Sequence, residues 1–185
     1  MLRPAPLSRP LRSVVLVPLA LVLALVASAP AQAAPDDCSN ATAAAAQVSQ
    51  HSVAEAVRCL VNAERAARRL PALRDVPALR RAADAHARDM VVRSFFAHVS
   101  PGGATLTDRT RRAGYDGFTL GEDIGWGSGQ LGTPAAIVEA WMHSPPHRAV
   151  ILHPRFREIG VGVNLGTPED RTASGAVYVI DLGRR

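Results

Sequence analysis

Three of the six histidines, His98, His143 and His147, lie in sequence contexts that suit metal binding or proton transfer. His143 and His147 are four residues apart, a spacing that would place two imidazoles on one face of a continuous helix as a metal pair. Pro145 and Pro146 lie between them and interrupt such a helix, so this pair is a weak metal candidate. Taken alone, His147 falls in the first turn after Pro146, where the field of a helix N-terminus favours a neutral imidazole. Spacing alone supports a capping or surface role for His147 equally well.

An acidic pair, Glu122 and Asp123, is flanked by glycine and apolar residues. This pattern suggests a strand that directs a carboxylate into a cleft. Two acids in a solvated turn would give the same pattern, and without further context the turn is favoured. The remaining histidines carry less signal. His86 lies on the apolar side of a predicted helix and is expected to be a core histidine with one hydrogen-bonded nitrogen, whereas His51 and His153 are expected in a solvated linker and a turn.

Local patterns predict the elements that position these residues. A capping box at Ser52–Glu55 opens the first helix, Pro77 suits the first position of the second, and Gly114 closes the third. Helices followed by strands favour an α+β domain with antiparallel pairing. The Ala-rich residues 34–50 have little to bury and are interpreted as a linker before a domain at 51–185. The predicted helices span 52–69, 77–96, 105–113, 133–144 and 147–152, and the predicted strands span 119–126, 159–163 and 177–182.

The first 33 residues have the organisation of a secretory signal peptide. Three arginines precede a short apolar run at residues 14–26, and Ala31-Gln32-Ala33 fits a small-x-small cleavage site. The run is shorter than the roughly 20 residues of a membrane span, although an uncleaved anchor is the alternative. We therefore predict secretion with cleavage near Ala33 and no membrane span afterwards. Cleavage removes three arginines and no acids, which lowers the formal charge from +5 to +2.

The composition excludes several classes of protein. A hydrophobic fraction of 48% is too high for a disordered polyelectrolyte, and two cysteines are too few for a disulfide-dense miniprotein. All 21 basic residues are arginines. The arginine pairs have aspartates close by, which is typical of a solvated surface of mixed charge, so no nucleic-acid partner is expected.

The predicted export bears on the redox state of the two cysteines, Cys38 and Cys59. In an oxidising compartment they are expected to form a disulfide, with two free thiols as the weaker alternative. Such a bridge would join the linker to the first helix and stabilise the fold by roughly 3 kcal/mol in the chain-entropy model.

Several short motifs together resemble a known family. The chain is similar, over about residues 53–182, to the bacterial secreted branch of the CAP superfamily, which includes cysteine-rich secretory proteins, venom antigens and plant pathogenesis-related proteins. The motifs, in chain order, are Asn62-Ala63-Glu64-Arg65, Phe96-Ala97-His98-Val99-Ser100-Pro101, Gly121-Glu122-Asp123-Ile124, Trp141-Met142-His143-Ser144-Pro145-Pro146-His147-Arg148 and Glu158-Ile159-Gly160-Val161-Gly162-Val163.

The resemblance implies an α-β-α sandwich with a small antiparallel sheet and a polar cleft over it. His98, Glu122 and His147 match cleft positions of the family, and some relatives hold a divalent ion, often zinc, between the two histidines. The resemblance therefore implies His98 and His147 as ligands of zinc or another divalent cation. Ser144 stands where eukaryotic members carry a second glutamate, and Asp123 replaces the family's asparagine, so the four-residue cluster is incomplete here.

The favoured function is a secreted binding or interaction module of the cell envelope or the extracellular space. Its expected partner is an envelope component, a lipid or an extracellular protein. The alternative is a metal-assisted hydrolase of peptide or envelope polymer, in which Glu122 would act as base on a zinc-bound water. The sequence has neither His-Glu-x-x-His nor Gly-x-Ser-x-Gly, so no catalytic residue is assigned.

Overall fold

The computed structural model describes residues 38–185, so the predicted signal peptide and residues 34–37 of the predicted linker lie outside the described residues. Two short 3-10 helices, η2 (Ala45–Gln47) and η3 (Gly129–Gly132), accompany the main elements. Among the described residues, no helix is long and apolar enough to cross a membrane. The helices are α1 (Gln50–Ala66), α2 (Pro77–Val92), α3 (Leu106–Arg112), α4 (Pro134–His143) and α5 (Pro145–Ile151), and the strands are β1 (Arg74–Asp75), β2 (Thr119–Ser128), β3 (Glu158–Leu165) and β4 (Gly175–Arg184).

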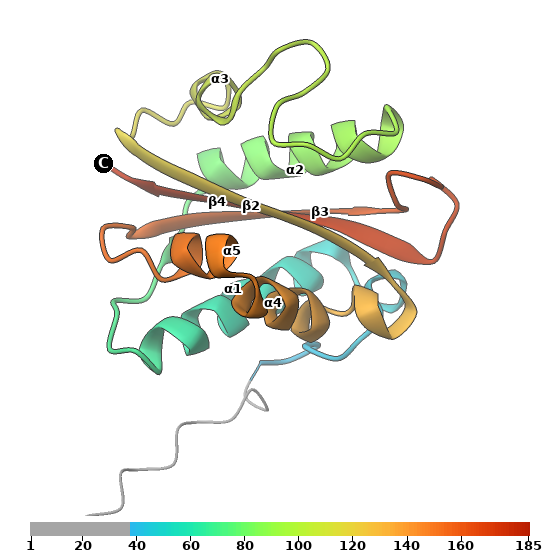
Figure 1. The fold of residues 1–185 in the computed structure, drawn as a ribbon, viewed down its shortest axis with the longest axis horizontal. Coiled ribbons are helices and arrows are strands. Elements are labelled where there is room, and N and C mark those ends of the chain that lie inside the picture. The colour runs from blue at the N-terminus through green and yellow to red at the C-terminus, as the bar shows by residue number, and fades with distance from the viewer. Residues whose placement is uncertain (1–37) are drawn as a thin grey trace, which may run out of the picture. The chain divides into compact units, whose positions relative to one another are not determined.

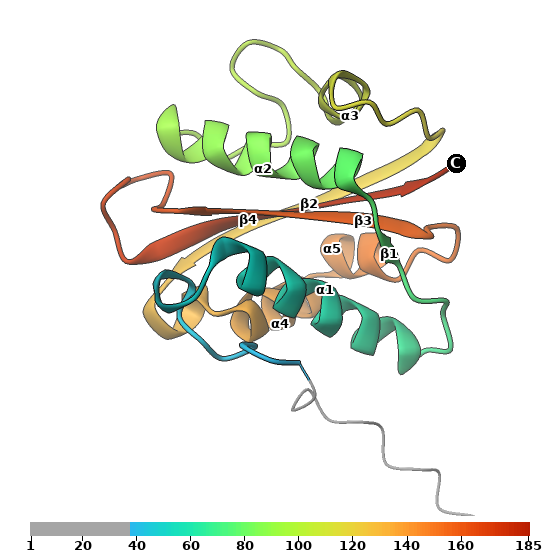
Figure 2. The same cartoon turned by 180° about the vertical axis from the view of Figure 1, so that it is seen from behind.

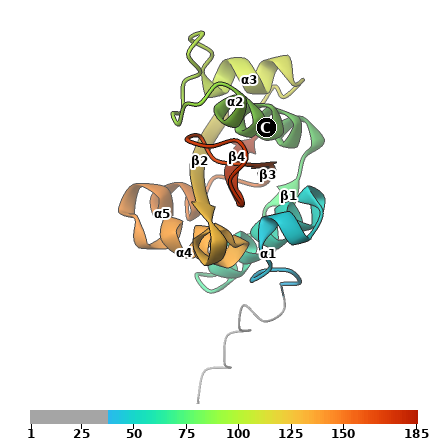
Figure 3. The same cartoon turned by 90° about the vertical axis from the view of Figure 1, so that its right-hand side faces the viewer.

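The elements form three layers, with the sheet between two groups of helices. Helices α2 and α3 cover one face, and α1, α4 and α5 cover the other (Figures 1 and 3). This arrangement confirms the expected α-β-α sandwich. The strand order is β1-β3-β4-β2, which makes β2 one edge of the sheet.

The sheet is mixed, because β1, which was not among the predicted strands, pairs with β3 in parallel through Arg74–Glu158 and Asp75–Ile159. The other pairings, β3 with β4 and β4 with β2, are antiparallel as expected. A two-residue strand is too short to show an alternating pattern, and its partner is more than eighty residues away, so the sequence carries no local signal for β1.

Alternation along the central strand β4 divides the core between the two faces. Val177 and Val179 face α2, where they pack with Ile124 and Met90. Tyr178, Ile180 and Leu182 belong to the larger cluster against α1, α4 and α5. Side chains of successive strand residues point to opposite faces, so this strand serves both cores.

Helix α1 begins earlier than the sequence pattern predicts. Ser49 is its N-cap and accepts a hydrogen bond from the Ser52 backbone N–H, so the predicted capping box at Ser52 is wrong. The disulfide between Cys38 and Cys59 is confirmed. Cys38, Ala41 and Ala45 are buried against the main core, so the described part of the Ala-rich segment packs on the domain rather than standing away from it.

A buried arginine explains the first sequence motif. Arg65 is fully buried in α1, and its guanidinium donates hydrogen bonds to backbone carbonyls before β1, at the end of α5 and between α5 and β3. Asn62, one turn earlier, exchanges two hydrogen bonds with the backbone of Leu73. Both side chains therefore hold together backbone segments that are distant in the sequence, and Arg65 is not part of the solvated charged surface.

Candidate functional site

The three predicted site residues come from different elements around the edge strand β2. Glu122 lies on β2, His147 lies in α5, and His98 lies in the loop between α2 and α3. His86 of α2 is fully buried, and its Nε2–H donates to the carbonyl of Ala97 at 3.0 Å. This bond holds the loop one residue before His98, and it confirms His86 as a core histidine with one hydrogen-bonded nitrogen.

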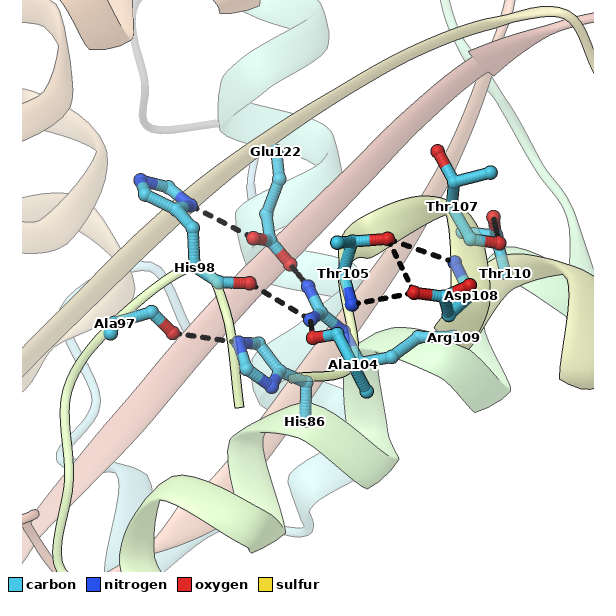
Figure 4. A network of polar contacts seen from close by, with 10 residues as sticks. All are labelled: His86, Ala97, His98, Ala104, Thr105, Thr107, Asp108, Arg109, Thr110 and Glu122. Atoms are coloured by element: carbon cyan, nitrogen blue, oxygen red, sulfur yellow. Dashed lines mark hydrogen bonds and ion pairs between the residues drawn. The ribbon is translucent and has the colours of Figure 1, made fainter. Parts of the chain in front are cut away.

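His98, Glu122 and Arg109 form a continuous polar network, drawn in Figure 4. The Nδ1–H of His98 donates to Oε1 of Glu122 at 2.8 Å, and Arg109 forms an ion pair with Oε2. Arg109 also donates to the carbonyls of His98 at 2.8 Å and Ala104 at 3.1 Å. The Glu122 side chain is only 3% exposed, whereas that of His98 is 55% exposed. A buried ion pair therefore anchors a histidine whose second ring nitrogen remains available at the surface.

The electrostatics of the network favour an ionised glutamate. Burial alone would raise the pKa of Glu122, but the hydrogen bond from His98 and the charge of Arg109 outweigh it, so the pKa lies below its usual range. The hydrogen bond to Glu122 raises the pKa of His98 in turn. The folded state thus holds the His98 proton to higher pH than an unfolded chain does. The stabilisation from this pair is present below pH about 6.5 and is lost as pH rises through the raised pKa.

His147 lies on the other side of the β2 edge and behaves differently. Burial lowers its pKa, and the nearby charge of His98 lowers it further. Its Nδ1 is buried without a hydrogen-bond partner among residues 38–185. Burial and the charge of His98 therefore favour the neutral imidazole of His147.

An apolar cavity of about 260 Å³ adjoins His147. Trp141 of α4 lines the cavity and donates its indole N–H to the carbonyl of Ile124 at 2.9 Å, which docks α4 on β2. Phe96 and Trp126 line the cavity while remaining 42% and 36% exposed. Exposed aromatic side chains around a cavity are typical of a surface that binds a ligand.

Two further carboxyl groups are buried beside Glu122. Burial, followed by the charge of Glu122, raises the pKa of Asp123 to about 8. Asp181 lies directly opposite Glu122 in the β2–β4 register and is fully buried. Burial and the charge of Glu122 raise its pKa well above the usual value. Asp123 is therefore largely protonated at neutral pH, and burial favours the protonated form of Asp181 too, whereas the lowered pKa of Glu122 favours its ionised form.

The His143–His147 pair does not form one helical face, because α4 ends at His143 and α5 begins at Pro145. His143 is exposed and donates its Nδ1–H to the carbonyl of Glu139. Within the described part of the chain, no group of three or more His, Cys, Asp or Glu side chains lies close enough to hold a metal ion.

Arg109 and Asp181 are the site residues that sequence reasoning missed. Arg109 is buried, while Arg111 and Arg112 of the same seven-residue helix are exposed. A helix of two turns is too short for periodicity to distinguish them. Asp181 lies in an apolar strand, and an acid within such a run is the one signal that would have marked it.

Comparison with known sequences gives a consistent family match. The model of the cysteine-rich secretory protein family, CAP, matches residues 59–180. "Uncharacterized protein YkwD" of Bacillus subtilis is 39% identical over 103 residues, which are 56% of this chain and 39% of that protein. "Uncharacterized membrane protein YlbC" of the same organism is 34% identical over 79 residues, 43% of this chain and 22% of that protein. The chain thus matches less than half the length of either relative.

Solved structures show the same fold. An extracellular protein containing an SCP domain from Bacillus anthracis has a TM-score of 0.60 and 24% identity, with 75% of this chain and 44% of that chain covered. An outer surface protein from Borrelia burgdorferi has a TM-score of 0.63 and 18% identity, with 75% of this chain and 96% of that chain covered. At these identities the likeness concerns the fold alone.

Proposed function

Because this chain belongs to the cysteine-rich secretory protein (CAP) family, we propose that it is a secreted binding module whose ligand docks against His98 and His147 at the edge of β2. The observation that carries this proposal is the pairing of buried Glu122 with exposed His98. A carboxylate that accepts from one ring nitrogen fixes the orientation and tautomer of a histidine and leaves the other nitrogen for a ligand. Arg109 keeps that carboxylate ionised and in place.

The surroundings indicate the chemical class of the ligand. The cavity beside His147 accepts an apolar group between Phe96 and Trp126. The raised pKa of His98 favours an imidazolium, which attracts an anionic head group. The proposed partner is therefore an amphiphilic component of the cell envelope, a lipid or a segment of an extracellular protein with these two features.

Secretion is supported by three independent features. The N-terminal sequence has the organisation of a signal peptide, and the Cys38–Cys59 disulfide is typical of oxidising compartments. Two proteins with the same fold are described as extracellular and as an outer surface protein.

Dodecanoate, a carboxylate with an apolar chain, tests this ligand class. We expect saturable binding by isothermal titration calorimetry, at least tenfold weaker in His98→Ala. Binding should be tighter at pH 6 than at pH 8, because the His98 charge is lost as pH rises through its raised pKa. His143→Ala removes an exposed histidine outside the network and should bind as the parent does. Equal affinity of His98→Ala and the parent would contradict the proposal.

Zinc titration of the protein without a His tag tests the proposed metal ligands. His98 and His147 offer two nitrogen donors, and water or a bound ligand would complete the coordination. We expect zinc binding that disappears in the His98→Ala/His147→Ala double variant and persists in His143→Ala. Binding should strengthen as pH rises, since zinc must displace the His98 proton. Zinc binding and dodecanoate binding can be told apart because their expected pH dependences are opposite. If the double variant binds zinc as the parent does, His98 and His147 are not the zinc ligands.

A binding role is better supported than hydrolysis. The hydrolase hypothesis requires Glu122 as a base, but both of its carboxylate oxygens are already engaged by His98 and Arg109. Its lowered pKa makes it a weak proton acceptor at neutral pH, where a general base works best with a pKa close to the operating pH.

A further inference from the structure

The outer edge of β3, on the side of the sheet opposite β2, is mostly unpaired. Strand β1 covers only Glu158 and Ile159, after which the chain leaves the sheet to begin α2 (Figure 2). From Gly160 to Leu165, β4 is the only sheet neighbour of β3 within residues 38–185. We use the word lane for the space beside β3 that is in line with β1. From Gly160 to Leu165, this lane holds no strand of residues 38–185.

Backbone groups of β3 point into this lane at alternate residues. The carbonyls of Arg157 and Ile159 accept hydrogen bonds from Arg74 and Val76, so the odd-numbered residues face outward. Val161 and Val163 follow in the same phase, and each is only 3% exposed, so a ligand would reach this edge through the cavity between α1 and α2. The Val163 N–H meets Oδ1 of Asp84 at 3.4 Å, a long contact that a better acceptor could replace. Such an edge is a template for another strand.

A cavity of about 390 Å³ follows the edge and is lined by Val161, Val163 and Asn164. The first turns of α1 form one wall through Gln50, His51 and Ala54. A row of charged side chains at every fourth position of α2, Arg80, Asp84 and Arg88, forms the other wall.

The spacing of the three charged residues along α2 matches the spacing of alternate residues along β3. A Cβ at Gly160 would lie 2.0 Å from the backbone nitrogen of Arg80, and a Cβ at Gly162 would lie 2.3 Å from that of Asp84. Four helix residues therefore correspond to two strand residues, which agrees with rises of about 6 and 6.6 Å. An added strand would place every second side chain opposite one charge of the row, in the order positive, negative, positive.

We propose that this edge binds an extended peptide segment of an extracellular protein by strand addition, with acidic, basic and acidic side chains at alternate positions. The carboxylates would pair with Arg80 and Arg88, and the basic side chain with Asp84. Arg80 already contacts Asp75 at 3.2 Å, whereas Arg88 is exposed and has no ion pair among the described residues. Main-chain hydrogen bonds supply the affinity in such complexes, and the alternating side chains supply the specificity.

A short labelled peptide provides the test. The peptide Ser-Glu-Thr-Lys-Thr-Glu-Ser-amide, with fluorescein on its N-terminal nitrogen, has the required charges in either strand direction, and fluorescence anisotropy measures its binding to the purified protein. We expect Arg88→Glu, and separately a peptide with Lys-Glu-Lys charges, to weaken binding at least tenfold. Arg155→Glu, at an exposed arginine outside the cavity, and His98→Ala, at the other sheet edge, should bind the peptide as the parent does.

Two further measurements give results that would contradict strand addition. A peptide N-methylated at alternate nitrogens keeps the charges but cannot complete the ladder, so its binding should be lost. Undiminished binding of the N-methylated or charge-reversed peptide would overturn strand addition. Sedimentation equilibrium identifies the other occupant: self-association that Arg88→Glu abolishes, without peptide binding, would assign the edge to a second copy of this chain and overturn the proposal.

Discussion

Replacing Arg109 with methionine should lower the free energy of unfolding by about 3–5 kcal/mol at neutral pH. The variant leaves Glu122 buried without its guanidinium partner, which is the costly way to break a buried ion pair. It also removes the hydrogen bonds that hold the loop at His98 and Ala104. The loss should be larger at pH 8 than at pH 6, because His98 with its raised pKa supplies a compensating charge at the lower pH. Urea denaturation at both pH values measures the difference.

Arg111→Met is the matched control, because Arg111 lies on the same helix and is exposed. Its expected change is below about 0.5 kcal/mol. The double variant Arg109→Met/Glu122→Gln should recover part of the lost stability, since no unpaired buried charge remains. If Arg109→Met is no less stable than Arg111→Met, the pair does not hold the site together.

Replacing Asp123 with asparagine should stabilise the protein by up to about 4 kcal/mol at pH 7 and by little at pH 4. Burial and the charge of Glu122 raise the pKa of Asp123 to about 8 from a usual value of 3.8. Between these values the unfolded state releases the proton while the folded state keeps it, so stability falls by about 1.4 kcal/mol per pH unit. Asparagine has the same shape and cannot ionise, although unpaired amide hydrogens offset part of the gain.

Thermal or urea unfolding across pH 4 to 8 measures this effect as a flatter stability profile in the variant. Asp116→Asn is the control, because the Asp116 side chain is 86% exposed and its contact with Arg185 is a surface ion pair. Parallel profiles for Asp123→Asn and the parent would show that Asp123 ionises in the folded protein with an ordinary pKa.

Local sequence signals predict the type of most helices and strands, but they predict the boundaries of these elements less accurately. The predicted starts of α2 at Pro77 and of α3 at Thr105 are correct, since Pro77 occupies the first turn of α2 and Thr105 is the N-cap of α3. The predicted end of α2 at Phe95–Phe96 is too late, because the helix ends at Val92. Apolar periodicity continues past the last helical hydrogen bond, and only packing decides where the chain turns away.

The candidate site was only partly predictable from the sequence. His98, Glu122 and His147 lie in short motifs, and the resemblance to a family identified them before any geometry was known. Their partner Arg109 is one of 21 arginines and has no distinguishing neighbours in the sequence. Its burial against Glu122 depends on how α3 packs over the edge of β2.

His98, Glu122 and His147 were identified through the resemblance to a family. The sequence by itself carries the prediction of a secretory leader, and it indicated the pairing of Cys38 with Cys59 and the order of the main helices and strands. These properties depend on composition, on spacing within a few turns, or on there being only two cysteines to pair. Only the tertiary structure decided the parallel strand β1, the burial of Arg109 and Asp181 beside Glu122, and the cavity that Arg88 lines along the edge of β3. Burial and charge pairing join residues that are distant in the chain, so they exist only once the layers have assembled.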